Sequence, residues 1–172
     1  MGVGASIVLI GVGNEFRTDD GLGILAAREI RRRNYPGVRV IETCGEGTAL
    51  VESWKGFDNV LLVDALCSGT TRGAVHRIDL TAKEIPRTFF RSSSHSFGVP
   101  EAVAMARQLQ LLPRVLVLYG IEACQFEDGS GLTDEVLKSI PQLLGLIEAD
   151  IVRLSPHSRP STEGLHDAAG GI

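Results

Sequence analysis

Residues 7–23, with the sequence IVLIGVGNEFRTDDGLG, constrain the fold more than any other part of the chain. They begin with a continuous apolar run that ends in glycine, which is typical of a strand buried on both faces of a parallel sheet. A glycine turn follows, then the acidic pair Asp19 and Asp20, and then a helical pattern. Open α/β sheets bind their ligands at the carboxyl ends of their strands. The stretch therefore predicts carboxylates at the ligand-binding edge of an α/β sheet.

Apolar periodicity predicts an alternation of strands and helices along the rest of the chain. Strands are expected at 6–11, 38–43, 59–65 and 114–120, and helices at 21–34, 47–55, 98–111 and 132–154, the last with a break at Pro141. Residues 66–72 are too few for a parallel crossover, so 73–80 should form an antiparallel strand at or near a sheet edge. The expected fold is a three-layer α/β/α sandwich, with a mixed, mostly parallel sheet of about five strands and helices on both faces.

Composition sets further limits. With 172 residues, 44% of them hydrophobic, the chain can bury one core, and we expect one domain over 1–154 and a disordered tail over 155–172. A net charge of −4 argues against a nucleic-acid partner. No apolar stretch approaches the roughly 20 residues that span a bilayer, so membrane insertion is not expected. The three cysteines are widely spaced without a C-x-x-C pair, which favours reduced thiols and a cytoplasmic protein. We also expect a monomer.

Three side chains are candidates for a metal site at the predicted sheet edge. Asp20 closes the acidic pair, Asp64 ends the apolar run VLLVDA, and His95 lies in the serine-rich loop RSSSHSFG. The structural alternatives are a helix cap for Asp20, a turn-forming role for Asp64 and a solvated or capping role for His95. Two carboxylates and an imidazole suit a borderline ion such as Ni, Zn, Mn or Fe, and leave open coordination positions.

The neighbouring motifs have supporting roles. We expect Asp19 to act as a cap or to support Asp20, beside the glycine-Asn14 turn. Gly45, Gly47 and Thr48 are expected to shape the cleft, the alternative being a glycine turn in which Thr48 caps the next helix. A dinucleotide site is rejected because G-V-G-N-E-F lacks the third glycine and acids stand where a pyrophosphate would lie.

Taken in order, five motifs resemble the hydrogenase maturation proteases. They are GVGNEFRTDDGLG, CGEGT, VDA, SHSFG and YGIE, and the resemblance runs from about residue 5 to residue 154. These endopeptidases trim the C-terminal extension from the precursor of the NiFe hydrogenase large subunit. The resemblance implies an α/β/α fold, a metal-contacting triad of Asp20, Asp64 and His95, and nickel that is already inserted in the precursor. Another divalent metal in the free protein is compatible with it.

The resemblance implies metal-assisted peptide hydrolysis. We expect the triad to engage the precursor's nickel and so to fix the scissile bond relative to a water molecule. The chain has no G-x-S-x-G elbow and no persuasive Cys-His motif, which argues against a covalent acyl-enzyme. One alternative is a nickel-recognising chaperone with the same contacts but no cleavage. Another is a peptidyl-tRNA-hydrolase-like esterase, which the negative net charge disfavours.

Overall fold

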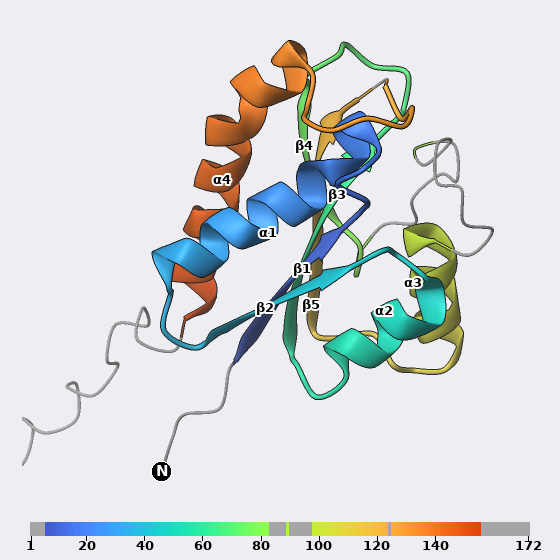
Figure 1. The fold of residues 1–172 in the computed structure, drawn as a ribbon. Coiled ribbons are helices and arrows are strands. Elements are labelled where there is room, and N and C mark those ends of the chain that lie inside the picture. Colours follow the sequence, from blue (N-terminus) through green and yellow to red (C-terminus); the bar gives the residue numbers. More distant parts are fainter. Residues whose placement is uncertain (1–5, 83–88, 90–97, 124, 156–172) are drawn as a thin grey trace, which may run out of the picture.

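The computed structural model describes residues 6–82, 89, 98–123 and 125–155. Its centre is a five-stranded sheet in the order β2-β1-β3-β5-β4 (Figure 1). The strands are β1 (Ile7–Val12), β2 (Val38–Thr43), β3 (Asn59–Leu66), β4 (Val75–Asp79) and β5 (Val115–Glu122). Neighbouring strands are parallel except for β4, which pairs antiparallel with β5 at one edge of the sheet. The predicted antiparallel edge strand is therefore confirmed.

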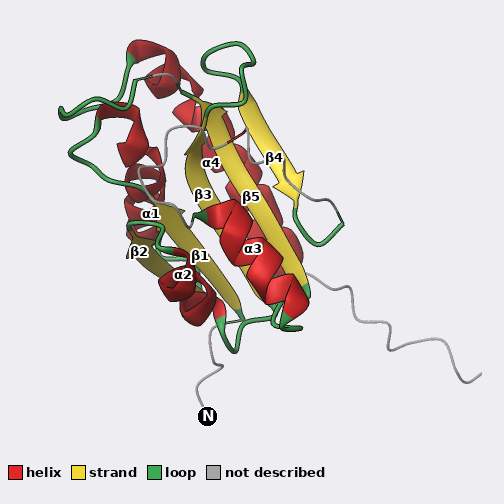
Figure 2. Ribbon diagram, turned by 90° about the vertical axis from the view of Figure 1, so that its right-hand side faces the viewer, coloured by secondary structure: helices red, strands yellow, loops and turns green. Residues whose placement is uncertain are grey.

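Helices cover both faces of the sheet. One face carries α1 (Leu22–Arg33) and α4 (Asp134–Leu154), and the other carries α2 (Gly47–Trp54) and α3 (Val99–Gln108) (Figures 1 and 2). Side chains along a strand alternate between the two faces. On β3, Val63 joins the apolar core beneath α1 and α4, whereas Leu62 joins the core beneath α2 and α3. The predicted α/β/α sandwich is confirmed.

Two local features differ from the expectations. The chain enters α1 through a short 3-10 helix, η1 (Thr18–Gly21), so the acidic pair precedes α1. The break predicted at Pro141 is wrong, because α4 continues through this residue. Proline removes one hydrogen bond from a helix and crowds the preceding turn. The buried side chains Leu143, Leu144 and Ile147 follow it directly, and their packing against the sheet keeps the helix continuous.

The carboxyl ends of β1, β2, β3 and β5 meet at one edge of the sheet, which we call the carboxyl edge. α3 also begins there. Near its other end, Arg107 Nη2 donates to the carbonyl oxygen of Leu80 at 2.9 Å, and Leu80 N donates to Leu116 O at the opposite edge. Across the described residues, none of the helices combines the length and apolarity needed to cross a membrane. The expected tail, apart from Ser155, lies outside the described residues.

Candidate functional site

Asp20 and Asp64 interact at the carboxyl edge. Asp64 lies near the end of β3 and is only 8% exposed, and its Oδ1 accepts a hydrogen bond from the backbone N–H of Ala65 at 2.8 Å. Asp20 is partly buried on η1. Burial raises the pKa of Asp64 well above its ordinary value, and the negative charge of Asp20 raises this pKa further. Two carboxylates that repel each other in this way favour a shared proton or a bound cation.

The turn after β1 fixes the backbone of Asp20. Gly13 has a φ of 140°, and a Cβ at this position would lie 1.9 Å from the carbonyl oxygen of Asp20. The same oxygen accepts a hydrogen bond from Asn14 N at 3.1 Å, and Asn14 Oδ1 accepts one from Phe16 N at 3.0 Å. The close approach of these two chain segments requires glycine at position 13. The supporting role predicted for Asn14 stays a prediction.

Asp19 is fully buried and joins η1 to the start of α4. Its Oδ1 accepts a hydrogen bond from Thr133 N at 2.7 Å, and its Oδ2 accepts one from Thr133 Oγ1 at 3.1 Å. Gln125 N also donates to Oδ2 at 3.4 Å, and Asp19 N donates to Gln125 O at 3.1 Å. Thr133 is the N-cap residue of α4. These contacts fix the backbone directly before Asp20, and the supporting role of Asp19 in the site stays a prediction.

We expect Asp19→Ala to lower the free energy of unfolding by about 1–3 kcal/mol, because it removes a fully buried acceptor and leaves the part-buried donors of Thr133 and Gln125 without it. Urea denaturation measures this difference. The matched control is Asp128→Ala, in the same segment but exposed, where a change within about 0.5 kcal/mol is expected. Equal losses of unfolding free energy for the two substitutions would show that the Asp19 contacts do not stabilise residues 125–133.

The segment between β2 and α2 also lies at the carboxyl edge. Gly45 has a φ of 85°, Glu46 is the N-cap residue of α2 and Gly47 begins the helix. The hydroxyl of Thr48, inside the first turn, donates to the carboxylate of Glu46. The alternative in which Thr48 caps this helix is therefore wrong. The predicted contribution of Gly45, Gly47 and Thr48 to a cleft stays a prediction.

The third predicted ligand, His95, lies outside the described residues. Among the residues that the structure does describe, no three His, Cys, Asp or Glu side chains form a group that could hold a metal ion. The described part of the chain thus brings together two members of the predicted triad, Asp20 and Asp64. The complete triad and its metal remain predictions.

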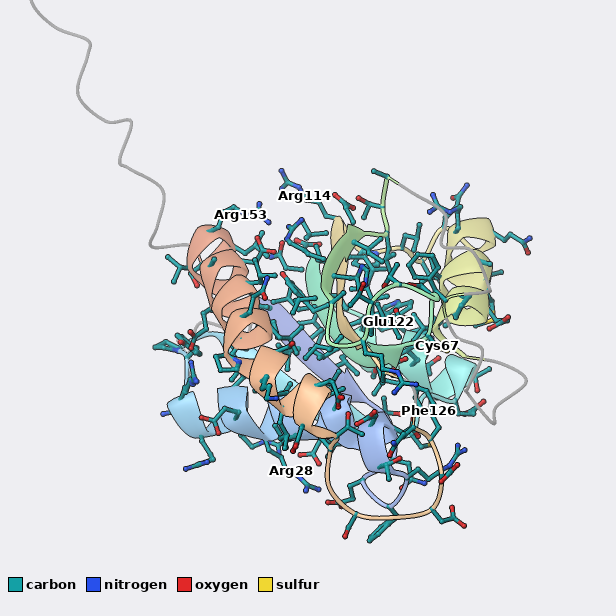
Figure 3. The ribbon with its side chains drawn as sticks, turned by 90° about the horizontal axis from the view of Figure 1, so that it is seen from above. Arg28, Cys67, Arg114, Glu122, Phe126 and Arg153 are labelled. Atoms are coloured by element: carbon teal, nitrogen blue, oxygen red, sulfur yellow. The ribbon has the colours of Figure 1, made fainter. Side chains whose placement is uncertain are left out.

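Sequence reasoning did not single out Glu122, the last residue of β5, as a site residue. Glu122 is 2% exposed, and its carboxylate accepts hydrogen bonds from Ser68 and Gly69 in the turn after β3. Figure 3, which views the molecule from above, labels Glu122 and Cys67 close together; Cys67 follows Leu66, the β3 partner of Glu122 in the sheet. The available signal was an acid ending the apolar strand VLVLYGIE, the same pattern that pointed to Asp64.

Comparisons with known proteins agree on one family. The family model described as hydrogenase maturation protease matches residues 24–150. A hydrogenase expression/formation protein of Bradyrhizobium diazoefficiens is 27% identical over 175 residues, which covers 96% of this chain and 90% of that protein. The hydrogenase 2 maturation protease of Escherichia coli is 27% identical over 165 residues, covering 94% and 99% respectively. The crystal structure of a NiFe hydrogenase maturation protease from Thermococcus kodakarensis has 26% identity and a TM-score of 0.66, and the match covers 87% of this chain and 93% of that one.

Proposed function

Because this chain belongs to the hydrogenase maturation protease family, we propose that it removes the C-terminal extension from the nickel-loaded large-subunit precursor of a NiFe hydrogenase. The observation that carries the proposal is the pair of Asp20 and Asp64 at the carboxyl edge. Burial and the charge of Asp20 raise the pKa of Asp64, which makes the pair receptive to a positive charge. A nickel ion held by the precursor supplies that charge.

The proposed roles follow from the chemistry of these groups. Asp20, Asp64 and His95 engage the nickel of the substrate and thereby hold the adjoining peptide bond against a water molecule. Bound nickel polarises a carbonyl or acidifies a water molecule. A raised pKa makes a carboxyl better suited to accept and return a proton during hydrolysis, and burial and the charge of Asp20 raise the pKa of Asp64.

We further propose that the protein acts as a monomer in the cytoplasm, where the precursor is its partner. Cys44 and Cys67 are both free thiols, which agrees with a reducing compartment. A nickel-recognising chaperone would make the same contacts with the precursor, so the decisive difference is cleavage itself.

The test is incubation of the protein with the nickel-loaded precursor, followed by mass spectrometry of the large subunit. We expect loss of the C-terminal peptide, and no loss from precursor that lacks nickel. An unchanged mass with stable binding would favour the chaperone. Equal cleavage of loaded and nickel-free precursor would contradict nickel recognition.

Substitutions in the triad test the site separately. We expect Asp20→Asn and His95→Ala to slow cleavage by about 10²- to 10⁴-fold, because each removes a group that orients the reacting atoms or moves a proton. Asp58→Asn, an exposed acid at the opposite edge of the sheet, is the control and should cleave at the wild-type rate. If the triad variants also cleave normally, the site assignment fails while the family assignment stands.

A further inference from the structure

Glu122 holds the turn that follows β3. Its carboxylate accepts three hydrogen bonds from this turn: from Ser68 N at 3.0 Å, from Ser68 Oγ at 2.8 Å and from Gly69 N at 2.7 Å. The side chain of Glu122 is 3% exposed. A buried carboxylate with three donors directed at it is a built contact rather than a chance one.

The Glu122 carboxylate is ionised in this setting. Burial by itself raises the pKa of Glu122, but the hydrogen bonds from Ser68 and Gly69 outweigh burial and leave the pKa below its ordinary value. Hydrogen bonds to a charged acceptor are roughly twice as strong as those between neutral groups. The turn at residues 67–70 is thus tied to the end of β5 by charge-assisted bonds.

The same turn contacts two further parts of the carboxyl edge. Cys67 N donates to the carbonyl oxygen of Phe89 at 2.7 Å, and Thr70 Oγ1 lies 3.2 Å from His76 Nε2 on β4. The His76 ring meets the Phe89 ring edge-on, with 6.4 Å between the centroids. Glu122 completes this set, since its Oε2 lies 3.9 Å from His76 Nε2. The end of β3, β4 and Phe89 are therefore connected through the turn that Glu122 holds.

Asp64 lies next to this anchor. In the pairing of β3 with β5, Asp64 is opposite Gly120 and Leu66 is opposite Glu122. Strand alternation places Asp64 and Glu122 on the sheet face that also carries Leu62 and Leu66, beneath α2 and α3. Only Leu66 separates the 67–70 turn from the Asp64-Ala65 peptide. The N–H of this peptide donates a hydrogen bond to the Asp64 carboxylate. The position of the turn thus limits how far the end of β3 can move.

We propose that Glu122 is a positioning residue of the peptidase site, which fixes the end of β3 and thereby the Asp64 carboxylate through the 67–70 turn. This inference rests on the proposed function, because it assigns to Asp64 a role in cleavage. Partners that orient a site residue in this way typically affect activity by about 10- to 100-fold when they are removed.

The test is Glu122→Gln in the full chain with the nickel-loaded precursor as substrate. The amide has only one acceptor atom for the three donors, so we expect kcat to fall by about 10- to 100-fold with little change in KM. Amide hydrogen exchange at Ser68 and Gly69 should become faster. Ser68→Ala, which removes one donor and keeps Glu122, should lower kcat by about 2- to 10-fold.

The matched control is Asp150→Asn. Asp150 is also a buried acid, 6% exposed, but it lies on α4, on the other face of the sheet, where it pairs with Arg77 and Arg153. We expect this variant to lose thermal stability like Glu122→Gln but to keep the wild-type kcat. The inference is overturned if wild-type protein cleaves and Glu122→Gln cleaves at the same rate, or if Asp150→Asn lowers kcat equally. A wild-type protein that leaves the precursor intact overturns the proposed function instead.

Discussion

Asp64→Asn is expected to slow processing strongly and, at the same time, to make the free protein more stable. The carboxyl of Asp64 is buried and lies within the field of Asp20, and both effects raise its pKa. Ionisation of Asp64 therefore destabilises the free fold, whereas asparagine has no charge to bury. We expect a gain of about 0.5–2 kcal/mol in the free energy of unfolding. Loss of the carboxylate should slow cleavage by about 10²- to 10⁴-fold.

The stability difference between wild-type protein and Asp64→Asn depends on pH. A carboxyl whose pKa is raised by folding contributes its full stability below its unfolded pKa of about 3.9 and loses that contribution as the pH rises through the folded pKa. Wild-type protein and Asp64→Asn should thus have similar free energies of unfolding near about pH 4. Above this pH, the advantage of the variant should grow. Urea unfolding from about pH 4 to about pH 8 measures the difference. A gap that is constant over this range would contradict the raised pKa.

The architecture follows from local patterns in the sequence. The apolar run of β3 predicts a strand buried on both faces, and the short connection from β3 to β4 excludes a parallel crossover. The continuity of α4 at Pro141 could not be predicted in this way. It depends on side chains such as Leu143 and Ile147 packing on a sheet whose strands are distant in sequence.

In the candidate site, too, some residues could be predicted from sequence patterns and others could not. Asp64 was predictable because an acid that ends an apolar strand must lie at the sheet edge. Glu122 shows the same pattern, but its donors Ser68 and Gly69 precede it by more than 50 residues, and only the fold brings them together. The partner of Asp19, Thr133, is 114 residues away. Sequence patterns thus identify the acids at the edge, whereas their hydrogen-bond partners require the structure.

Gly23→Ala is expected to cause the largest loss of stability. Gly23 lies in the first turn of α1, where this helix rests directly on the sheet. A Cβ at this position would lie 2.1 Å from the carbonyl oxygen of Val12 and 2.4 Å from that of Val63. Both are backbone atoms of the central strands, which cannot rotate away as a side chain can. We expect the free energy of unfolding to fall by about 3 kcal/mol or more, measured by urea denaturation.

The control for Gly23→Ala is the same substitution at Gly145, in α4. Gly145 is also helical, but a Cβ there would have no neighbour within 4 Å, so alanine should stabilise the protein by about 0.4–1 kcal/mol. Stability changes of opposite sign at the two positions would show that close contact with the sheet, rather than helix propensity, requires glycine at position 23. A similar effect at both would contradict this. Because α1 continues directly from η1, a helix displaced by the added methyl group also moves Asp20 away from Asp64, so cleavage should fall together with stability.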